Sequence, residues 1–425
     1  MNAPTPVPSA SRAARVQQIV TPGGIEAWLV EDYAVPMVAF DFAFKAGATN
    51  DPAGRMGATS MMSALLDEGA GSFDADAFHR ALDEKAVELS FRAGYDAING
   101  DLKTLSRYVD DAFEFLRLSL SQPRFDEDAI ERVRSQTIAG LRHEANDPDA
   151  VAGKTWRQAA FPGHPYGLPA GGDLASVAAI TRADIASMHA ALMARDNLRI
   201  AAVGAIDAKR LSALIDKAFA DVPAKSNAQP VAPVIPVSGA RHVADIDVPQ
   251  TTLRISLPGI SRHDRDFVPA VVLNHIFGGG SFSSRLFQEV REKRGLAYSV
   301  WTQLQNYGQS ELLSGGTSTK NERALESLQV IEEQMNLLLK DGPTPDELEK
   351  AKKYLIGSYA LRFDTSTKIA GNLVSMQVDG YPVEYLDQRN GMIAAVTMDD
   401  INRAAKRLFE GKSFLVAAAG RPVGL

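Results

Sequence analysis

Phe277 to Val300 reads FGGGSFSSRLFQEVREKRGLAYSV, and the rest of the chain is best interpreted outward from this stretch. Its run of three glycines (Gly278, Gly279 and Gly280) lets the backbone turn freely and approach another chain or a ligand closely. Either Ser281 or Ser283 is then expected to cap a helix whose apolar residues share one face. The stretch therefore predicts a glycine turn followed by an amphipathic helix.

Gly295 is predicted to end this helix, because glycine readily adopts the left-handed conformation that follows a helix C-terminus. A strand is expected to start at Leu296. Arg291 and Tyr298 lie on opposite sides of this turn, where a helix-to-strand reversal would point both side chains at one spot. Together they would offer fixed donors to a carbonyl oxygen that becomes negative during a reaction. The same spacing also fits a surface arginine at a helix end and a half-buried strand tyrosine.

The segment GGGSFSSRLFQEVREKRGLAYSV resembles the second-domain signature of the pitrilysin-like (insulinase-type) zinc peptidases. In that family an arginine and a tyrosine seven residues later help to bind the substrate and stabilise its oxyanion. The resemblance gives these catalytic roles to Arg291 and Tyr298. We expect the triglycine run Gly278–Gly280, with Ser281, to line the path of an extended substrate. A plain turn leading into the helix is the alternative for the glycines.

Composition bounds the class of protein. The 425 residues are 45% apolar and 23% charged, the profile of a soluble globular protein, and the length suggests at least two domains. The net charge of −7 argues against nucleic acid or an anionic membrane surface as the main partner. No apolar run approaches the ~20 residues that span a bilayer. The absence of cysteine excludes disulfides, thiolate metal sites and cysteine nucleophiles.

The first 15 residues are rich in proline, alanine and serine and are predicted to form a flexible tail. They lack the apolar centre of a signal peptide, so we expect a cytoplasmic protein. A periplasmic location fits only if a leader has been removed ahead of this start.

An internal repeat is visible in the second part of each half. Two features recur, each with its copies 216 residues apart, and a gap-free match of this kind indicates duplication. The first is a helix-capping pair and the second is an apolar strand that ends at a glycine. The copies are Thr181/Asp184 with Thr397/Asp400, and the strand ends at Gly204 and Gly420.

The family resemblance extends from about residue 16 to residue 422. It implies an α+β fold class with two homologous domains, each a mainly antiparallel sheet with helices packed on one side. It also implies a chamber closed by two such halves from each of two chains, or by four halves in one chain. The predicted divisions are a tail (1–15), an N-terminal domain (16–221), a proline-rich linker (222–246) and a C-terminal domain (247–425).

The H-x-x-E-H zinc motif of that family is missing. The chain has seven histidines, and no two of them have this spacing. Where the motif should stand, the two ligand positions carry Ser60 and Ala64, and the general-base position carries Ser63. The downstream carboxylate ligand should fall near Ala139 and Gly140. Hydroxyl and methyl groups cannot build a zinc site with three ligands, so we expect this chain to bind no metal cofactor.

The resemblance therefore implies the non-metal-binding subunit of a heterodimeric zinc peptidase that hydrolyses peptides. A homologous partner would hold Zn²⁺ and the general base, and this chain would supply Arg291 and Tyr298. The alternatives are an inert structural subunit, or a module that captures extended peptides by strand addition. A self-sufficient enzyme is disfavoured, because no G-x-S-x-G, phosphate-loop or dinucleotide motif appears.

Overall fold

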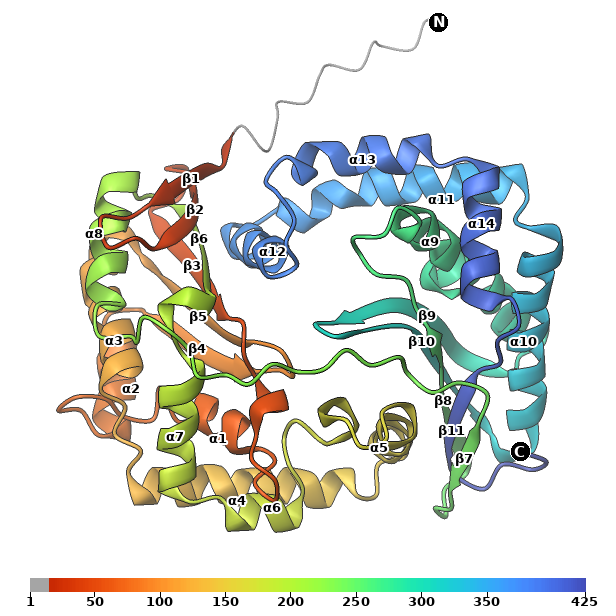
Figure 1. The fold of residues 1–425 in the computed structure, drawn as a ribbon, viewed down its shortest axis with the longest axis horizontal. Coiled ribbons are helices and arrows are strands. Elements are labelled where there is room, and N and C mark those ends of the chain that lie inside the picture. The colour runs from red at the N-terminus through yellow and green to blue at the C-terminus, as the bar shows by residue number, and fades with distance from the viewer. Residues whose placement is uncertain (1–14) are drawn as a thin grey trace, which may run out of the picture.

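The computed structural model describes residues 15–425, so the predicted tail lies outside the described residues except for its last residue. The described strands form two sheets (Figure 1). The first has the order β1-β2-β6-β3-β5-β4, and the second has the order β7-β11-β8-β10-β9. The strands of the first sheet are β1 (Gln17–Val20), β2 (Glu26–Glu31), β3 (Met37–Phe44), β4 (Glu88–Ala93), β5 (Ile98–Leu105) and β6 (Leu198–Gly204). Those of the second are β7 (Arg241–Ala244), β8 (Gln250–Pro258), β9 (Ala297–Tyr307), β10 (Ser310–Lys320) and β11 (Leu415–Ala419).

The two sheets share one topology once β1 is set aside. Each has a single parallel pair, β2 with β6 and β7 with β11, and its other pairs are antiparallel. This repetition confirms the predicted α+β fold with two homologous halves. The strand β7 lies inside the segment 222–246 that was predicted as a linker, and the domain boundaries themselves stay a prediction.

Fourteen α-helices of the described residues surround the sheets. Those of the first half are α1 (Ala58–Ala64), α2 (Ala75–Glu84), α3 (Val109–Ser121), α4 (Glu127–Glu144), α5 (Pro148–Ala160), α6 (Leu174–Ala179), α7 (Arg182–Leu192) and α8 (Ala208–Ala218). Those of the second are α9 (Phe267–Asn274), α10 (Ala324–Asp341), α11 (Pro345–Gly357), α12 (Ser366–Val378), α13 (Tyr385–Ala395) and α14 (Met398–Phe409). The predicted capping boxes at Thr181 and Thr397 are present and open α7 and α14. Among the described residues, no helix combines the length and the apolar character that crossing a membrane requires.

The central strand β3 shows why the first sheet is covered on both faces. It reads MVAFDFAF, with large phenylalanines alternating with small alanines, so the two residue types point to opposite faces. The phenylalanines join the main core of the first half. Ala39 and Ala43 face the other way and pack against Ala370 and Leu373 of α12. Small side chains on that face let a helix from the second half approach the sheet closely.

The two halves exchange one helix each. The helix α12 of the second half lies on β3 and β6, and α5 of the first half lies on β8 and β11 (Figure 1). On α5, Trp156 and Ala160 are buried against Leu415 and Ala417 of β11. The Trp156 Nε1–H donates a hydrogen bond of 2.8 Å to the Ser256 Oγ. Each half therefore completes the packing of the other.

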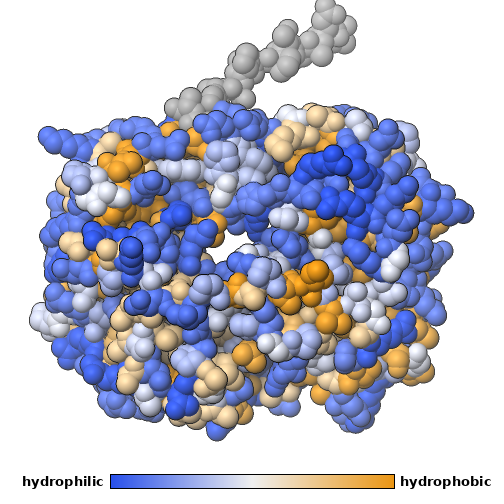
Figure 2. Space-filling view, in the orientation of Figure 1, coloured by the Kyte–Doolittle hydropathy of each residue, from blue (hydrophilic) through white to orange (hydrophobic). Residues whose placement is uncertain are grey.

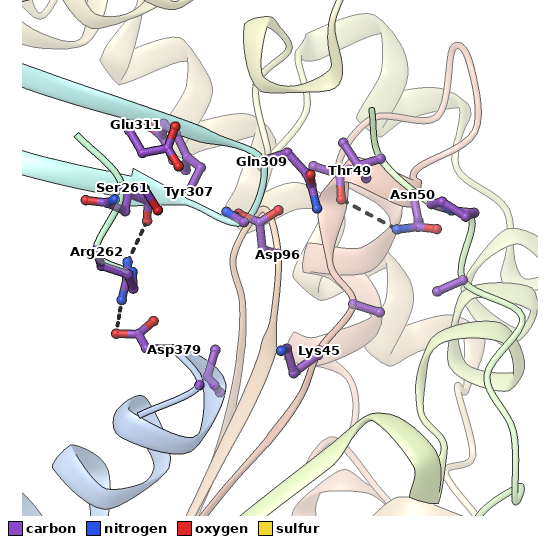
Figure 3. A pocket seen from close by; sticks show the side chains of 18 of the residues that line it. Lys45, Thr49, Asn50, Asp96, Ser261, Arg262, Tyr307, Gln309, Glu311 and Asp379 are labelled. Atoms are coloured by element: carbon purple, nitrogen blue, oxygen red, sulfur yellow. Dashed lines mark hydrogen bonds and ion pairs between the residues drawn. The ribbon is translucent and has the colours of Figure 1, made fainter. Parts of the chain in front are cut away.

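The halves also meet where the β4–β5 and β9–β10 turns approach each other. Asp96 accepts hydrogen bonds from the Gly308 amide at 2.9 Å and from the Tyr166 hydroxyl at 2.7 Å. The ring of Tyr166, which is fully buried, stacks on Tyr307 with 4.6 Å between centroids. A cavity of about 620 Å³ lies beside this contact, with Lys45 and Asp96 on its walls (Figure 3). Figure 2 shows an opening near the centre of the molecule, between the halves.

A cluster of ion pairs joins the start of α9 to α14 and makes stability depend on pH. Asp266 is 1% exposed and accepts from Arg403 and Arg407, and Asp264 accepts two bonds from Arg407 at 2.7 and 2.9 Å. The Arg407 guanidinium lowers the pKa of Asp264 to about 2. Because this folded-state pKa lies below the ordinary value of 3.8, the interaction stabilises the fold fully above about pH 4. It is lost as the pH falls toward 2.

Asp264→Asn is therefore expected to lower the free energy of unfolding at pH 7 by about 1 to 2 kcal/mol. The variant should also lose part of the stability change between pH 4 and pH 2, measured by urea unfolding at several pH values. Asp346→Asn is the control, because its ion pair with Lys350 is exposed at both ends. Parallel stability curves for the wild type and Asp264→Asn across that pH range would contradict the assignment.

Candidate active site

The triglycine run continues α9 as a wide π-helical turn, His275–Gly279, which ends beside β9. A Cβ on Gly278 would lie 2.5 Å from the Thr302 Oγ1 of β9, and one on Gly280 would lie 2.5 Å from the His275 carbonyl oxygen. Glycine is therefore required here for close packing. The following residue, Ser281, has a φ of +46°, in the left-handed region that favours glycine. The chain therefore leaves α9 in a tight turn that has no room for a side chain at Gly278 or Gly280.

The helix that follows is capped differently from the prediction. Ser281 and Ser283 lie in a short 3₁₀ turn, and the Ser283 Oγ donates to the Gly280 carbonyl. The cap is Ser284, whose Oγ accepts from the Phe287 amide at 3.3 Å. The prediction of Ser281 or Ser283 as the cap was wrong, because the 3₁₀ turn delays the start of the helix.

The end of this helix agrees with the prediction. Its last turns, Phe287–Lys293, are π-helical, and Gly295 follows with a φ of +57°. The Gly295 amide donates to the Arg291 carbonyl and the Leu296 amide donates to the Val290 carbonyl, at 2.9 and 2.8 Å. These two backbone hydrogen bonds end the helix, and β9 begins two residues after Gly295.

The turn brings Arg291 and Tyr298 together. The Arg291 Cζ lies 4.5 Å from the centroid of the Tyr298 ring and 4.7 Å from that of Phe287. Stacking between two rings orients the guanidinium plane. The only ion pair described for Arg291 joins its Nε to Glu292 over 3.6 Å, which is too long for a hydrogen bond. The N–H groups are thus directed by packing and remain available to a ligand.

The Tyr298 ring is 81% exposed, and no hydrogen bond of the described residues uses its hydroxyl. Together with Arg291 it borders a cavity of about 620 Å³. Gly278, Gly279 and Ser281 also line this cavity, whereas Gly280 does not. The sequence analysis did not single out Phe282, which lines it too and is 70% exposed. The signal in the sequence that could have identified Phe282 is an aromatic residue placed among glycines and serines.

One wall of the cavity is the strand β9, from residue 298 to residue 303. β9 is the last strand of its sheet and pairs only with β10. Its outer edge therefore has no partner strand, although at Thr302 this edge is covered, because the Asn274 Nδ2 donates to the Thr302 carbonyl at 3.3 Å. Such an edge is suited to pairing with an extended peptide.

The positions of the missing zinc motif lie on α1, in the other half. The Ser60 Oγ donates to the Ala170 carbonyl at 2.9 Å, and the Ser63 Oγ donates to the Thr59 carbonyl at 3.0 Å. Ser63 is 1% exposed, and Ala64 has only a methyl group. On α4, Ala139 and Gly140 are exposed and offer no ligand atom. Among the described residues, no three His, Cys, Asp or Glu side chains lie close enough together to hold a metal ion. This donor set does not fit zinc.

Restoring the motif alone is expected to be insufficient. The triple variant Ser60→His, Ala64→His and Ser63→Glu should retain well below one equivalent of zinc after dialysis, because Ala139 and Gly140 carry no carboxylate to act as the third ligand. Elemental analysis of the dialysed protein measures this. The matched control changes the same three positions to alanine. Stoichiometric zinc in the triple variant would show that a third ligand exists elsewhere.

Residues 179–355 match the family model described as Peptidase M16 inactive domain. The chain is 25% identical to the non-peptidase homolog YmxG of Helicobacter pylori, over 88% of this chain and 86% of that protein. It is 26% identical to the mitochondrial-processing peptidase subunit beta of Lentinula edodes, over 76% and 72%. The solved structure of a peptidase M16 inactive domain from Pseudomonas fluorescens superimposes with a TM-score of 0.90 and 26% identity, covering 96% of this chain and 98% of that one.

Proposed function

Because this chain is a member of the peptidase M16 family, we propose that it is the non-metal-binding subunit of a two-chain zinc peptidase. One observation carries the proposal: Arg291 and Tyr298 are stacked 4.5 Å apart, with their donor groups free, at a cavity beside an open strand edge. A merely structural homologue needs no such exposed pair. The degenerate residues on α1 explain why the metal must come from another chain.

In this proposal an extended peptide pairs with the outer edge of β9. The phenol of Tyr298 and the guanidinium of Arg291 then donate to the oxygen of one peptide carbonyl. Both donors are held before substrate arrives, Arg291 by stacking between two rings and Tyr298 by its place at the start of β9. Donors that need no rearrangement stabilise a developing negative charge better than solvent does. The glycine loop leaves room for the peptide backbone beside them.

The partner in this proposal is a homologous subunit with an intact zinc motif. Its zinc would supply an activated water and its glutamate would act as the base. The mitochondrial-processing peptidase subunit beta of Lentinula edodes, to which this chain is similar, is named as one subunit of a peptidase, which supports the proposal of a partner subunit. This chain would contribute binding and orientation of the peptide together with the two donors.

The test measures cleavage of a quenched fluorescent peptide by three samples: this chain, a purified homologous subunit with an intact H-x-x-E-H motif from the same organism, and their mixture. The expected result is cleavage in the mixture alone, with zinc found only in the partner. A stable complex that cleaves nothing would overturn the peptidase role and favour a structural subunit. Peptide binding by this chain alone, measured by fluorescence anisotropy and without cleavage in the mixture, would favour a capture module.

A further inference from the structure

A further cavity, of about 420 Å³, lies between α9, α12, α13 and β9, where the exchanged helix α12 meets the second half. Four charged residues line it: Arg262, Arg362, Asp379 and Arg389. Three guanidiniums face one carboxylate, which leaves an excess of two positive charges. This excess is notable in a chain whose net charge is −7. The cavity therefore differs in charge from the molecule around it.

The buried cation of this cavity is Arg389, which is 9% exposed. Its Nη1 donates to the Leu355 carbonyl at 3.1 Å and to the Asn390 Oδ1 at 3.2 Å. Its Cζ lies 4.3 Å from the centroid of the Tyr359 ring. These contacts orient the guanidinium without neutralising it, and no ion pair among the described residues includes Arg389. Burial of an uncompensated charge is costly and also lowers the pKa of Arg389.

The single acid of the cavity is already engaged. Asp379 forms an ion pair with Arg262, which Figure 3 shows from the side of the neighbouring cavity. The Arg262 Nη2 also donates to the Asn306 carbonyl at 3.1 Å. Arg362, by contrast, is exposed and has no ion pair among the described residues. The two positive charges that remain for a ligand therefore belong to Arg362 and Arg389.

Aromatic side chains form the rest of the wall. They are Phe267, Tyr359, Phe363, Tyr381 and Tyr385. The rings of Tyr381 and Tyr385 are stacked, with centroids 4.2 Å apart and planes 18° apart. The Tyr381 hydroxyl donates to the Arg262 carbonyl, so this ring is held in place. Flat apolar walls beside two unpaired guanidiniums suit a ligand with an apolar ring or chain and one negative group.

We propose that this cavity binds a carboxylate carried on an aromatic body, with Arg389 and Arg362 holding the carboxylate and the tyrosine walls holding the ring. A guanidinium matches the two oxygens of a carboxylate in a planar, paired arrangement. The carboxylate comes either from a small aromatic acid or from a peptide that ends in an aromatic residue. Neither Arg291 nor Tyr298 lines this cavity, although it shares Asn274 and Gln303 with the cavity beside them. The proposal does not depend on the proposed peptidase role.

Isothermal titration calorimetry on the full chain tests the proposal, with N-acetylphenylalanine as the probe and its C-terminal amide as the uncharged match. Saturable binding of the acid, with the amide at least about tenfold weaker, is expected. A pentapeptide ending in free phenylalanine distinguishes the two sources, because binding tighter than that of the probe assigns the site to peptide termini. Absence of saturable acid binding up to millimolar concentration, or equal binding of the amide, overturns the proposal. Tighter binding of phenyl phosphate than of the acid overturns the choice of carboxylate.

Two variants locate the binding. Arg389→Met removes the buried charge at similar volume and should abolish binding of the acid. Arg362→Gln changes an exposed residue, so the fold should be kept, and should weaken binding at least about tenfold. Arg265→Gln is the control, since its side chain is 82% exposed and lies outside the cavity. Circular dichroism checks folding, and Arg362→Gln decides the outcome if Arg389→Met does not fold. Unchanged affinity in Arg362→Gln overturns the assignment.

Discussion

In the mixed peptidase, Arg291→Ala is expected to lower kcat/KM by roughly 10²- to 10³-fold, which corresponds to about 2.7 to 4 kcal/mol of transition-state stabilisation. The reason is the loss of a charged donor that stacking has already oriented toward the cavity. Tyr298→Phe keeps the ring and removes only the hydroxyl, so its effect should fall within the same range. The measurement is the initial rate of peptide cleavage at substrate concentrations well below KM.

The two changes should not be additive. Both donors would act on one oxygen, so the double variant is expected to lose less than the sum of the two single losses. The metal content of the partner should stay the same in every sample, because neither residue is part of the metal site. A full complement of zinc with a slow rate would therefore separate loss of donors from loss of metal.

Matched controls come from the same half. Tyr354→Phe removes a hydroxyl from another exposed tyrosine, which stacks on His275 and does not line the cavity. Lys293→Gln removes a cation two residues after Arg291, where the side chain pairs with Glu289. Both controls should keep the wild-type rate. Unchanged rates in Arg291→Ala and Tyr298→Phe, in a mixture that does cleave peptide, would refute their role and leave the two-chain assembly intact.

Local patterns in the sequence predicted much of this structure. The spacing of 216 residues between the two capping boxes, and between Gly204 and Gly420, corresponds to the shared topology of the two sheets. Both glycines have a φ of +140°, so they occupy equivalent backbone positions. Capping and strand-ending signals act over a few residues, which is why a single sequence reveals them.

The helix α5 was not predicted, although its sequence carries signals. Asp147 accepts from the Ala150 amide as the cap, and Pro148 is at the first helical position. Ala152, Trp156 and Ala160 are buried at intervals of four residues. Its packing partner could not be read from the sequence, because α5 lies on the sheet of the other half. An exchange of this kind depends on how the two halves dock and leaves no local pattern.

The candidate site divides in the same way. Arg291 and Tyr298 were singled out through the family resemblance, and they lie together because a helix, a glycine and a strand follow one another within eight residues. The arginines of the 420 Å³ cavity lie far apart in the sequence and on different elements. Arg262 and Arg389, for example, are separated by 127 positions (389 − 262). They line one cavity only because α13 packs on α9 and residues of α9, α12, α13 and β9 meet there. Their spacing in the sequence does not indicate that these arginines line the same cavity.

The largest expected loss of stability comes from Phe42→Ala in β3. The Phe42 ring is fully buried and has ring contacts with Phe40, Phe44, Phe91 and Phe219, at centroid distances of 5.8 to 6.0 Å. Removal of such a ring costs about 3 to 5 kcal/mol, from lost burial and from the cavity that remains. Urea unfolding of the full chain, followed by circular dichroism, measures it. Phe282→Ala is the control, because that ring is 70% exposed and should contribute less than about 0.5 kcal/mol.

The residue opposite Phe42 makes the prediction sharper. Gly100 is its partner across β3 and β5, and a Cβ there would overlap the Phe42 ring. Gly100→Ala alone should therefore destabilise the protein by about 1 to 3 kcal/mol, because a packed ring must move. In the Phe42→Ala background the same methyl group enters the empty space, so Gly100→Ala should then be neutral or stabilising. A cost for Gly100→Ala that is the same in both backgrounds would show that the ring does not occupy this position, since a direct steric contact must disappear with the ring.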